Sequence, residues 1–211
     1  MKKLAAVITL LVCCLFVFSG TSSADLISNG DFEYPVITAY YQKVGAGDPA
    51  LTGWTVGGTS IDIVRMGYDV KPWAYSGLQA VDMAGSPGPG SISQSIQTIP
   101  ETTYQLSFFV SSNADQGSGF ANSLRVYWND VLQQSYSSPI PGTWNNYTLL
   151  LLAKSPSSKL TFDTDISSLN NPYQGPLLDN VSLNAVPIPP SVWLLGSSLI
   201  GLVALRRRFR K

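Results

Sequence analysis

Carboxylates are the main groups available for chemistry in this chain of 211 residues. The sequence contains no histidine, and its only two cysteines are Cys13 and Cys14. This excludes triads and general bases that use histidine, cysteine–histidine pairs and histidine zinc sites. Paired carboxylates, as in glycosidases, or a serine–lysine pair remain for catalysis. Because 13 acidic residues make some pair inevitable, we assign no catalytic residue and predict that the protein is not an enzyme.

Glu33 and Asp179 are the carboxylates whose positions are most informative. Asp179 shares its parity with Leu177, Val181 and Leu183, so a strand there would turn its carboxylate toward the interior with those side chains. A buried carboxylate needs a partner. In the alternative interpretation, Asp179 caps a turn and Glu33 is solvated.

Aromatic side chains in irregular segments are the candidate ligand-binding groups. Loops at one end of a β-sandwich are common recognition sites, and sugars bind to flat aromatic faces. The alternative is that these rings pack over the edge of the core. The candidate ligand-binding residues are Tyr68, Trp73, Tyr75 and Tyr173, with Tyr40 and Tyr41 in a similar stretch.

The distribution of charged residues predicts a negative surface for the middle of the chain. Seven of the 13 basic residues lie in the two ends of the chain, so the middle carries six basic residues against all 13 acids, a net charge of −7. Such a surface argues against binding to nucleic acid. Asp62, Asp69 and Asp82 are the candidates for a catalytic carboxylate pair, because they lie close to the aromatic loops. Since carboxylates are mostly exposed, we expect these three to be solvated instead.

These groups must be positioned by β-strands, because the sequence between residues 25 and 185 alternates with a period of two and has no long helical period. The run 147–152 is apolar on both parities, as in a central strand covered on both sides. About ten short strands separated by turn residues predict an all-β fold, a single jelly-roll β-sandwich. The strands that we expect most clearly cover residues 60–64, 78–83, 91–98, 104–111, 124–128, 131–136, 147–152, 160–163 and 177–183.

Residues 1–24 have the pattern of a signal peptide. A positive start at 1–3 is followed by an apolar run at 4–18, and small residues occupy 22–24, where a signal peptidase cleaves. The apolar run is short for a membrane span, which needs about 20 residues. We therefore predict export by way of signal peptidase and a mature chain that begins near Asp25, without cysteines.

Residues 186–211 have the pattern of a membrane-sorting tail. Prolines come first, residues 191–205 can form one uncharged apolar helix, and the last six residues are mostly basic. Such a helix would be about 22 Å long, less than the ~30 Å of a hydrocarbon core, so it is a marginal transmembrane span. The basic end belongs on the cytoplasmic side and places the domain outside. A buried core helix is the alternative, which the basic end disfavours.

The tail resembles the PEP-CTERM sorting signal of Gram-negative bacteria, which combines a proline motif, an apolar helix and a final arginine cluster. The resemblance implies processing by an exosortase and release from an inner-membrane intermediate to the cell surface or extracellular matrix. Ile188 replaces the glutamate of the family's motif, which leaves open which processing enzyme reads it. The matching residues are Val186, Pro187, Pro189, Arg206, Arg207 and Arg208.

Five motifs between residues 26 and 183 resemble the DUF642-like group of galactose-binding-like sandwiches, including the bacterial choice-of-anchor C proteins. They are Leu26-Ile27-Ser28-Asn29-Gly30-Asp31-Phe32-Glu33, Gly53-Trp54-Thr55-Val56, the segments 76–85 and 90–94, and Gly175-Pro176-Leu177-Leu178-Asp179-Asn180-Val181-Ser182-Leu183. The resemblance implies a jelly roll, often carbohydrate-binding, in which the first and last strands meet.

That meeting would bring Glu33 and Asp179 together. Two carboxylates at one place repel each other unless a cation or proton lies between them. Calcium binds six to eight oxygens, including backbone carbonyls, and similar sandwich modules hold a structural calcium at matching positions. We therefore expect Glu33 and Asp179 to bind Ca²⁺. We expect a non-catalytic surface or matrix protein that binds polysaccharide through its loops. The alternatives are a self-associating structural protein of the matrix and, third, a glycoside hydrolase-like enzyme.

Overall fold

The computed structural model describes residues 24–67, 72–113, 115, 122–137, 139–165 and 173–187. Ala24–Ala185 forms a compact unit that consists of strands, turns and loops. Within the described ranges no helix is long and apolar enough to cross a membrane. The predicted signal segment before Ala24 and the predicted helix at 191–205 lie outside the described residues.

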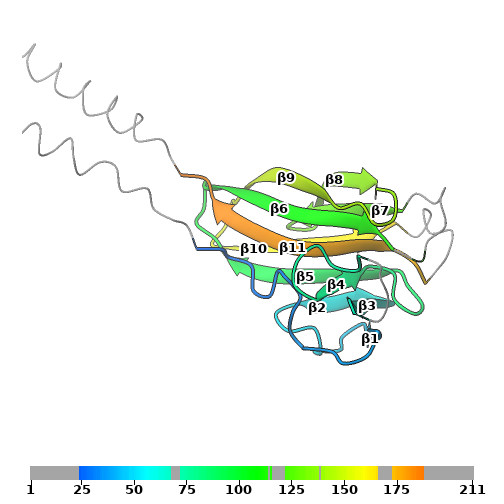
Figure 1. Ribbon diagram of the computed structural model, residues 1–211. Coiled ribbons are helices and arrows are strands. Elements are labelled where there is room, and N and C mark those ends of the chain that lie inside the picture. The colour runs from blue at the N-terminus through cyan, green and yellow to red at the C-terminus, as the bar shows by residue number, and fades with distance from the viewer. Residues whose placement is uncertain are drawn as a thin grey trace, which may run out of the picture. The chain divides into compact units, whose positions relative to one another are not determined.

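Two antiparallel sheets form a β-sandwich (Figure 1), which confirms the predicted all-β jelly roll. The six-stranded sheet has the order β1-β3-β4-β11-β6-β9, and the five-stranded sheet has the order β2-β5-β10-β7-β8. The strands are β1 (Tyr41–Gly45), β2 (Thr55–Gly58), β3 (Ser60–Arg65), β4 (Gln79–Asp82), β5 (Gly90–Gln97), β6 (Thr103–Ser112), β7 (Ser123–Trp128), β8 (Val131–Ser137), β9 (Asn145–Leu152), β10 (Ser157–Thr164) and β11 (Pro176–Ala185).

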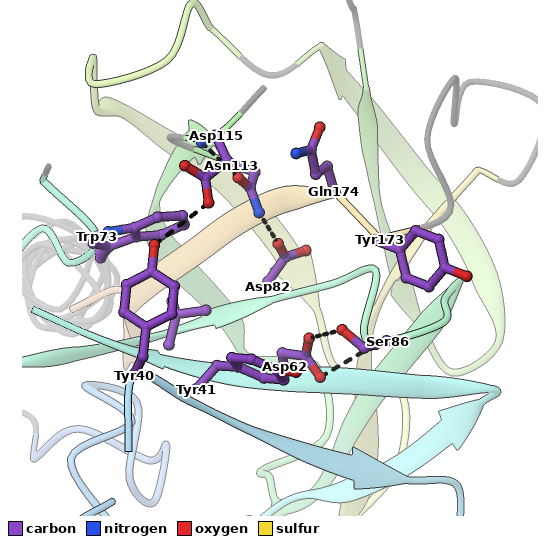
Figure 2. Close-up of a pocket in the computed structure, with 11 residues that line it drawn as sticks. Tyr40, Tyr41, Asp62, Trp73, Asp82, Ser86, Asn113, Asp115, Tyr173 and Gln174 are labelled. Atoms are coloured by element: carbon purple, nitrogen blue, oxygen red, sulfur yellow. Dashed lines mark hydrogen bonds between the residues drawn. The ribbon is translucent and has the colours of Figure 1, made fainter. Parts of the chain in front are cut away.

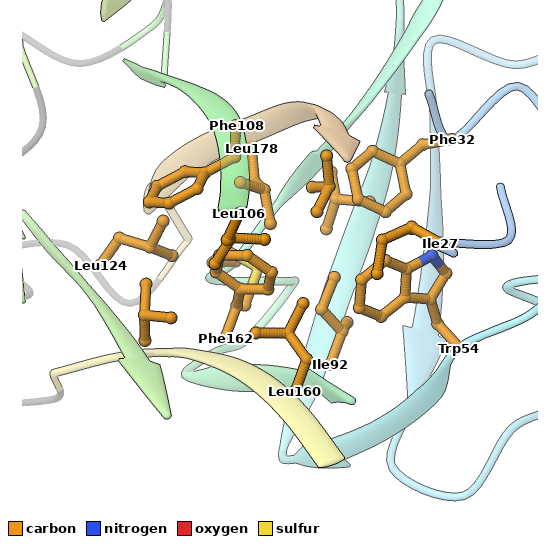
Figure 3. Packing of buried hydrophobic residues seen from close by; sticks show 14 of the residues in the cluster. Ile27, Phe32, Trp54, Ile92, Leu106, Phe108, Leu124, Leu160, Phe162 and Leu178 are labelled. Carbon is orange, nitrogen blue, oxygen red and sulfur yellow. The ribbon is translucent and has the colours of Figure 1, made fainter. Parts of the chain in front are cut away.

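The main core lies between the sheets and follows from the period-two pattern. In β6 the buried residues Leu106, Phe108 and Val110 alternate with side chains on the other face, as a pleated strand requires. Burying one such side chain stabilises the fold by about 1.5–3 kcal/mol. Figure 3 shows Leu106 and Phe108 beside inward-facing residues of the other sheet, such as Ile92 and Leu160.

A chain of aromatic contacts runs through this core. Phe32 packs against Trp54, with ring centroids 5.6 Å apart, and Trp54 lies 6.3 Å from Phe162. Phe162 meets Phe108 edge to face at 5.2 Å, and Phe108 meets Tyr136 in the same way at 5.3 Å. These geometries are favourable for aromatic pairs, and they connect the N-terminal segment to β8 across both sheets.

The N-terminal segment runs beside β11 at the end of the domain. Leu26 donates its backbone N–H to Leu183 O at 3.0 Å, and Val181 donates to Gly30 O at 2.8 Å. A Cβ at position 30 would lie 1.9 Å from Val181 O, so only glycine allows this approach. The first and last segments of the domain therefore meet, although the first one is not a regular strand.

A second, smaller cluster lies on the outer face of the six-stranded sheet. Its buried residues are Val64, Trp73, Ala74, Ala80 and Leu177. Three of these come from β3, β4 and β11, where they alternate with residues of the main core. The segment that contains Trp73 and Ala74 covers them. This outer cluster is the base on which the candidate site is built.

The prediction that residues 147–152 form a central strand is wrong. The strand β9 is an edge strand that pairs only with β6. Tyr147, Leu149 and Leu151 pack on the main core, but Leu150 is 66% exposed and Leu152 is 44% exposed. The continuous apolar run therefore marks an edge with an apolar outer face.

The face on which Asp179 lies also differs from the prediction. The register between β11 and β6 shifts between Asp179 and Ser182, and Asn180 has a φ of 50°. This β-bulge inserts one extra residue. As a result Asp179 lies with Leu177 on the outer face, whereas Val181 and Leu183 belong to the main core. Asp179 is buried as expected, but not between the sheets.

Candidate functional site

An open cavity of about 380 Å³ lies on the outer face of the six-stranded sheet. Asp62 alternates along β3 with the core residues Ile61 and Ile63, so its side chain points away from the sandwich interior. Figure 2 shows the lining side chains gathered from β1, β3, β4 and the adjoining loops. The lining residues are Tyr40, Tyr41, Asp62, Val64, Trp73, Asp82, Ser86, Asn113, Asp115, Tyr173 and Gln174.

Asp62 and Asp82 face each other across the β3–β4 pair. Residues directly opposite each other on antiparallel strands have Cβ atoms about 4.5–5.5 Å apart, so the two carboxylates share one side of the cavity. Asp62 is only 5% exposed and Asp82 only 1%. Our expectation that both are solvated is therefore wrong, because the loops above the outer face cover them. Asp69 lies outside the described residues.

The partners of Asp82 are all uncharged. The backbone N–H groups of Ala84 and Gly175 each donate to Asp82 Oδ1 at 2.9 Å, and Asn113 Nδ2 donates to Oδ2. Burial raises the pKa of Asp82 to about 7, against the effect of these hydrogen bonds, and the neighbouring Asp62 raises it further. Close to neutral pH this group therefore exchanges a proton.

Asp62 has a milder environment. Ser86 donates its hydroxyl to Asp62 Oδ2 at 2.7 Å and its backbone N–H to Oδ1 at 3.3 Å. Burial raises the pKa of Asp62, while the hydrogen bonds from Ser86 and the positive charge of Lys43 lower it. Lys43 is the residue opposite Asp62 on β1, so the cross-strand pairing places this cation nearby.

Tyrosine rings border the two carboxylates. In Figure 2, Tyr40 and Tyr173 lie on opposite sides of Asp82. Tyr40 meets Trp73 edge to face, with centroids 5.3 Å apart, and its hydroxyl donates to Asp115 Oδ2 at 3.4 Å. Tyr173 is 57% exposed, whereas Trp73 is 1% exposed. The tyrosines therefore offer accessible ring surface, and Trp73 forms the base beneath Tyr40.

Tyr75 does not line this cavity, although it was a candidate. Tyr75 stacks on Phe109 of β6, with ring centroids 3.5 Å apart and planes at 15°. It also contacts Trp144 at 6.2 Å. Tyr68 lies outside the described residues. The structure thus brings Trp73 and Tyr173 together with Tyr40 and Tyr41, and places Tyr75 on a neighbouring part of the same face.

Glu33 and Asp179 bind the same turn. The backbone N–H groups of Tyr75 and Ser76 donate to Asp179 Oδ2 at 2.8 and 3.0 Å. Those of Leu78 and Gln79 donate to Glu33 Oε1 at 2.6 and 2.8 Å. The two carboxylates therefore hold the segment that leads into β4, and they fix its position on the outer face.

Gly77 is required at the centre of this turn. Its φ is +62°, and a Cβ there would lie 2.2 Å from Glu33 Oε1.

Burial raises the pKa of Asp179 to about 7, and the charge of Glu33 raises it further. The two acidic groups are therefore close enough to interact, as expected if the first and last segments meet.

The donor set is compatible with calcium only in part. Glu33 and Asp179 would supply two carboxylate ligands, but Asp179 Oδ1 and Oδ2 and Glu33 Oε1 all accept backbone N–H groups. Across the described ranges, no group of three or more His, Cys, Asp or Glu side chains could hold a metal ion. The other ligands would have to be backbone carbonyls and water.

Sequence reasoning did not find the polar residues Ser86, Asn113, Asp115 and Gln174 in the cavity. Each lies just beyond a strand end or in a loop. The first and the last of them, Ser86 and Gln174, are 88 positions apart in the sequence. The one sequence signal is the position of Asn113, two residues after the predicted strand 104–111. The others are brought together only by the sheet order.

Known proteins resemble this chain in sequence and in fold. The model of a family described as "Protein of unknown function (DUF642)" matches residues 25–184. No curated protein matches the sequence. The structure is similar to TmCBM61 in complex with β-1,4-galactotriose, with 18% sequence identity and a TM-score of 0.51, over 78% of this chain and 100% of that one.

Two further solved structures resemble this chain at lower TM-scores. The CBM22-1 xylan-binding domain of Xyn10C from Paenibacillus barcinonensis has 15% identity and a TM-score of 0.49, over 81% of this chain and 99% of that one. A family 35 carbohydrate-binding module from Clostridium thermocellum has 15% identity and a TM-score of 0.44, over 69% and 98%. At such identities the likeness to solved structures concerns the fold.

Proposed function

The chain belongs to the DUF642 family of proteins of unknown function, and we propose that it is a non-catalytic protein. It binds polysaccharide in the cavity on the outer face of the six-stranded sheet. The observation that carries this proposal is the combination of exposed tyrosine rings with buried carboxylates in one open cavity. Rings offer flat apolar faces to sugar C–H groups, and carboxylates accept hydrogen bonds from hydroxyl groups. The similar fold of TmCBM61, solved with a galactotriose, supports this proposal.

The ends of the chain complete the proposal. Residues 1–24 would direct export, and signal peptidase would remove them. The tail 186–211 would hold the protein in the inner membrane of a Gram-negative bacterium until an exosortase processes it, and the product would reside at the cell surface or in the extracellular matrix. Asp25 supports the first step, because its carboxylate accepts the backbone N–H groups of Ile27 and Leu183 at 3.0 and 2.9 Å. A mature chain that begins there keeps the whole domain.

A structural calcium ion belongs to the same proposal. Glu33 and Asp179 would each provide a carboxylate oxygen, and the ion would neutralise the repulsion between them. Its role would be to join the N-terminal segment, β11 and the turn 75–79, and it would take no part in ligand binding in the cavity.

Binding to insoluble and soluble polysaccharides tests the proposed function. We expect the protein to be retained by at least one polysaccharide, and the substitutions Tyr173→Ala and Tyr41→Ala to weaken retention by about tenfold, since a stacked ring contributes about 1–1.5 kcal/mol. Tyr75→Ala is the matched control, because Tyr75 is a half-exposed ring outside the cavity. If only Tyr75→Ala loses binding, the binding site lies at Tyr75 and not in the cavity. If no polysaccharide retains the protein, the proposal is contradicted.

Self-association is a second candidate function, and the exposed edge of β9 favours it. The strand carries no charged residue and no proline, and such long uncharged edges pair readily with other strands. A second copy of the chain would pair with β9 and cover Leu150. Leu150→Lys should then abolish dimers in sedimentation velocity, whereas Ile140→Lys, at another exposed apolar residue, should not. A monomeric parent protein at high concentration would contradict this function.

A further inference from the structure

The charge of the cavity indicates which polysaccharides suit it. Its lining contains Asp62, Asp82 and Asp115, and none of the described lining residues is basic. Lys43 lowers the pKa of Asp62 from the neighbouring strand, but it does not line the cavity. The cavity therefore presents a negative surface to a ligand.

In the described part of the chain, the hydrogen-bond donors to Asp62 and Asp82 are all neutral groups. The hydrogen-bond donors to Asp82 are two backbone N–H groups and the side-chain amide of Asn113, and those to Asp62 both belong to Ser86. Buried carboxylates are usually paired with a cation, because removing a charge from water is costly. A cationic ligand would place a positive charge beside these two carboxylates.

The rings of the cavity suit the same ligand. Tyr41 and Tyr173 are 48% and 57% exposed, and Tyr40 stands edge-on to Trp73 beside the carboxylates. A sugar ring packs on such faces through its C–H groups, and a cation is attracted to the face of an aromatic ring within about 6 Å. Aromatic walls around an acidic centre therefore fit a flat sugar that carries a positive charge.

We propose that the cavity selects polysaccharides whose sugars carry a free, protonated amino group, an inference that rests on the proposed polysaccharide binding and adds the class of ligand. An ammonium group has three N–H donors and a full charge, so one group can bridge both aspartates. A hydroxyl donates only one hydrogen bond and leaves the charge uncompensated. An N-acetyl group is neutral, and a uronic acid is repelled by the aspartates.

Three oligosaccharides of the same β-1,4-linked chain and the same length separate these cases: one of glucosamine, one of N-acetylglucosamine and one of glucose. Their affinities for the full-length protein in mild detergent are measured by calorimetry in the presence of a chelator. We expect the glucosamine chain to bind at least about tenfold more tightly than the other two, and its affinity to fall as salt is raised. Equal affinities, or tighter binding of a neutral chain, would overturn the inference.

Substitutions assign the effect to the cavity. Asp62→Asn should remove most of the preference for glucosamine, and Asp115→Asn is a second variant in case the first unfolds in a melting control. Asp130→Asn is the matched control, since Asp130 is an exposed acid on another part of the domain, with a left-handed φ of 62° that asparagine tolerates. An unchanged preference in both cavity variants would contradict the inference.

Different experimental results would contradict the proposed polysaccharide binding and the proposed preference for amino sugars. If a wider panel of neutral and acidic polysaccharides yields a ligand but amino sugars do not bind, polysaccharide binding stands and the amino-sugar preference is wrong. If binding of any ligand requires calcium, the aspartates serve a metal ion and the inference is likewise wrong. If no polysaccharide binds, both proposals are contradicted.

Discussion

Asp82 is held in a position where its charge is costly. It is 1% exposed, its partners are neutral, and Asp62 lies directly opposite. A pKa raised from 3.8 to about 7 means that folding favours the protonated acid. The unfolded chain releases this proton near pH 3.8, and the folded protein keeps it until about pH 7. Between those values the folded state binds more protons, so the free energy of unfolding falls as the pH rises.

The first prediction concerns this slope. The raised pKa of Asp82 corresponds to roughly 4 kcal/mol of unfolding free energy. Asp179, whose pKa is also raised to about 7, adds a second contribution of the same sign. Without calcium, the melting temperature should therefore fall between about pH 4.5 and pH 7.5. Asp82→Asn should remove about half of this dependence, because asparagine does not titrate, whereas Asp130→Asn should keep it. The same slope in Asp82→Asn as in the parent would contradict the raised pKa.

The second prediction concerns calcium at Glu33 and Asp179. If the ion binds the folded protein, calcium at a hundred times its dissociation constant stabilises it by about 2.7 kcal/mol. A chelator should then lower the melting temperature by several degrees, since ~1 kcal/mol is worth roughly 2–4 °C at this size. Asp179→Ala should abolish the difference between chelator and calcium, while Asp130→Ala should retain it. A melting curve that calcium does not change would mean that the backbone N–H groups are the only partners of these carboxylates.

In β11, one extra residue changes the face of the sheet on which the neighbouring side chains lie. The bulge at Asn180 places Asp179 on the outer face and returns Val181 to the core. Asparagine tolerates the left-handed conformation that the bulge needs, and its own N–H donates to Asp179 Oδ1 at 2.6 Å. The bulge is therefore the local feature that gives the turn 75–79 its carboxylate.

The third prediction tests this bulge. Asn180→Val should destabilise the domain by about 1–2 kcal/mol, because a β-branched residue is strained at a φ of 50°. Asn180→Gly, which has no such strain, should cost less than ~1 kcal/mol. Urea unfolding measures both changes. Equal stabilities of the two variants would indicate that Asn180 is not held in this conformation.

The strands were predictable where one face alone is apolar. The alternation at 104–111 and 160–163 predicts β6 and β10, because a period of two needs only a core on one side. β1 was missed, since four of its five residues are at least partly exposed and no apolar alternation appears. β9 was misplaced, because an apolar outer face at a sheet edge has the same pattern as a fully covered strand. The sequence alone does not distinguish such an edge strand from a strand that is covered on both faces.

The candidate site was predictable only in its residue types. Aromatic rings and carboxylates could be named from their loops, but Asp62 and Asp82 were expected in solvent. Their burial depends on the β3–β4 pairing and on the segment with Trp73 that covers the outer face. Both are long-range contacts, which no local pattern near the two aspartates specifies.

At the scale of the whole molecule, β11 separates the ends of the domain from the cavity. The backbone hydrogen bond from Leu26 to Leu183 brings the first and last residues of the domain to one end of this strand. Gln174, which lines the cavity, lies two residues before the other end at Pro176. Ten strand residues extend over roughly 30 Å. The proposed processing at either end would therefore leave the cavity unchanged.

The last prediction concerns the C-terminal tail. β11 ends at Ala185, so cleavage within 187–190 would leave every described strand intact and would release the domain from the apolar segment 191–205. In a strain that lacks its exosortase, the protein should remain membrane-bound at full length. In the parent strain, mass spectrometry of the surface or matrix fraction should find a form that ends within 187–190. Lys211 on mature surface protein of the parent strain would show that the tail is a permanent anchor, because a sorting signal that has been read loses its basic end.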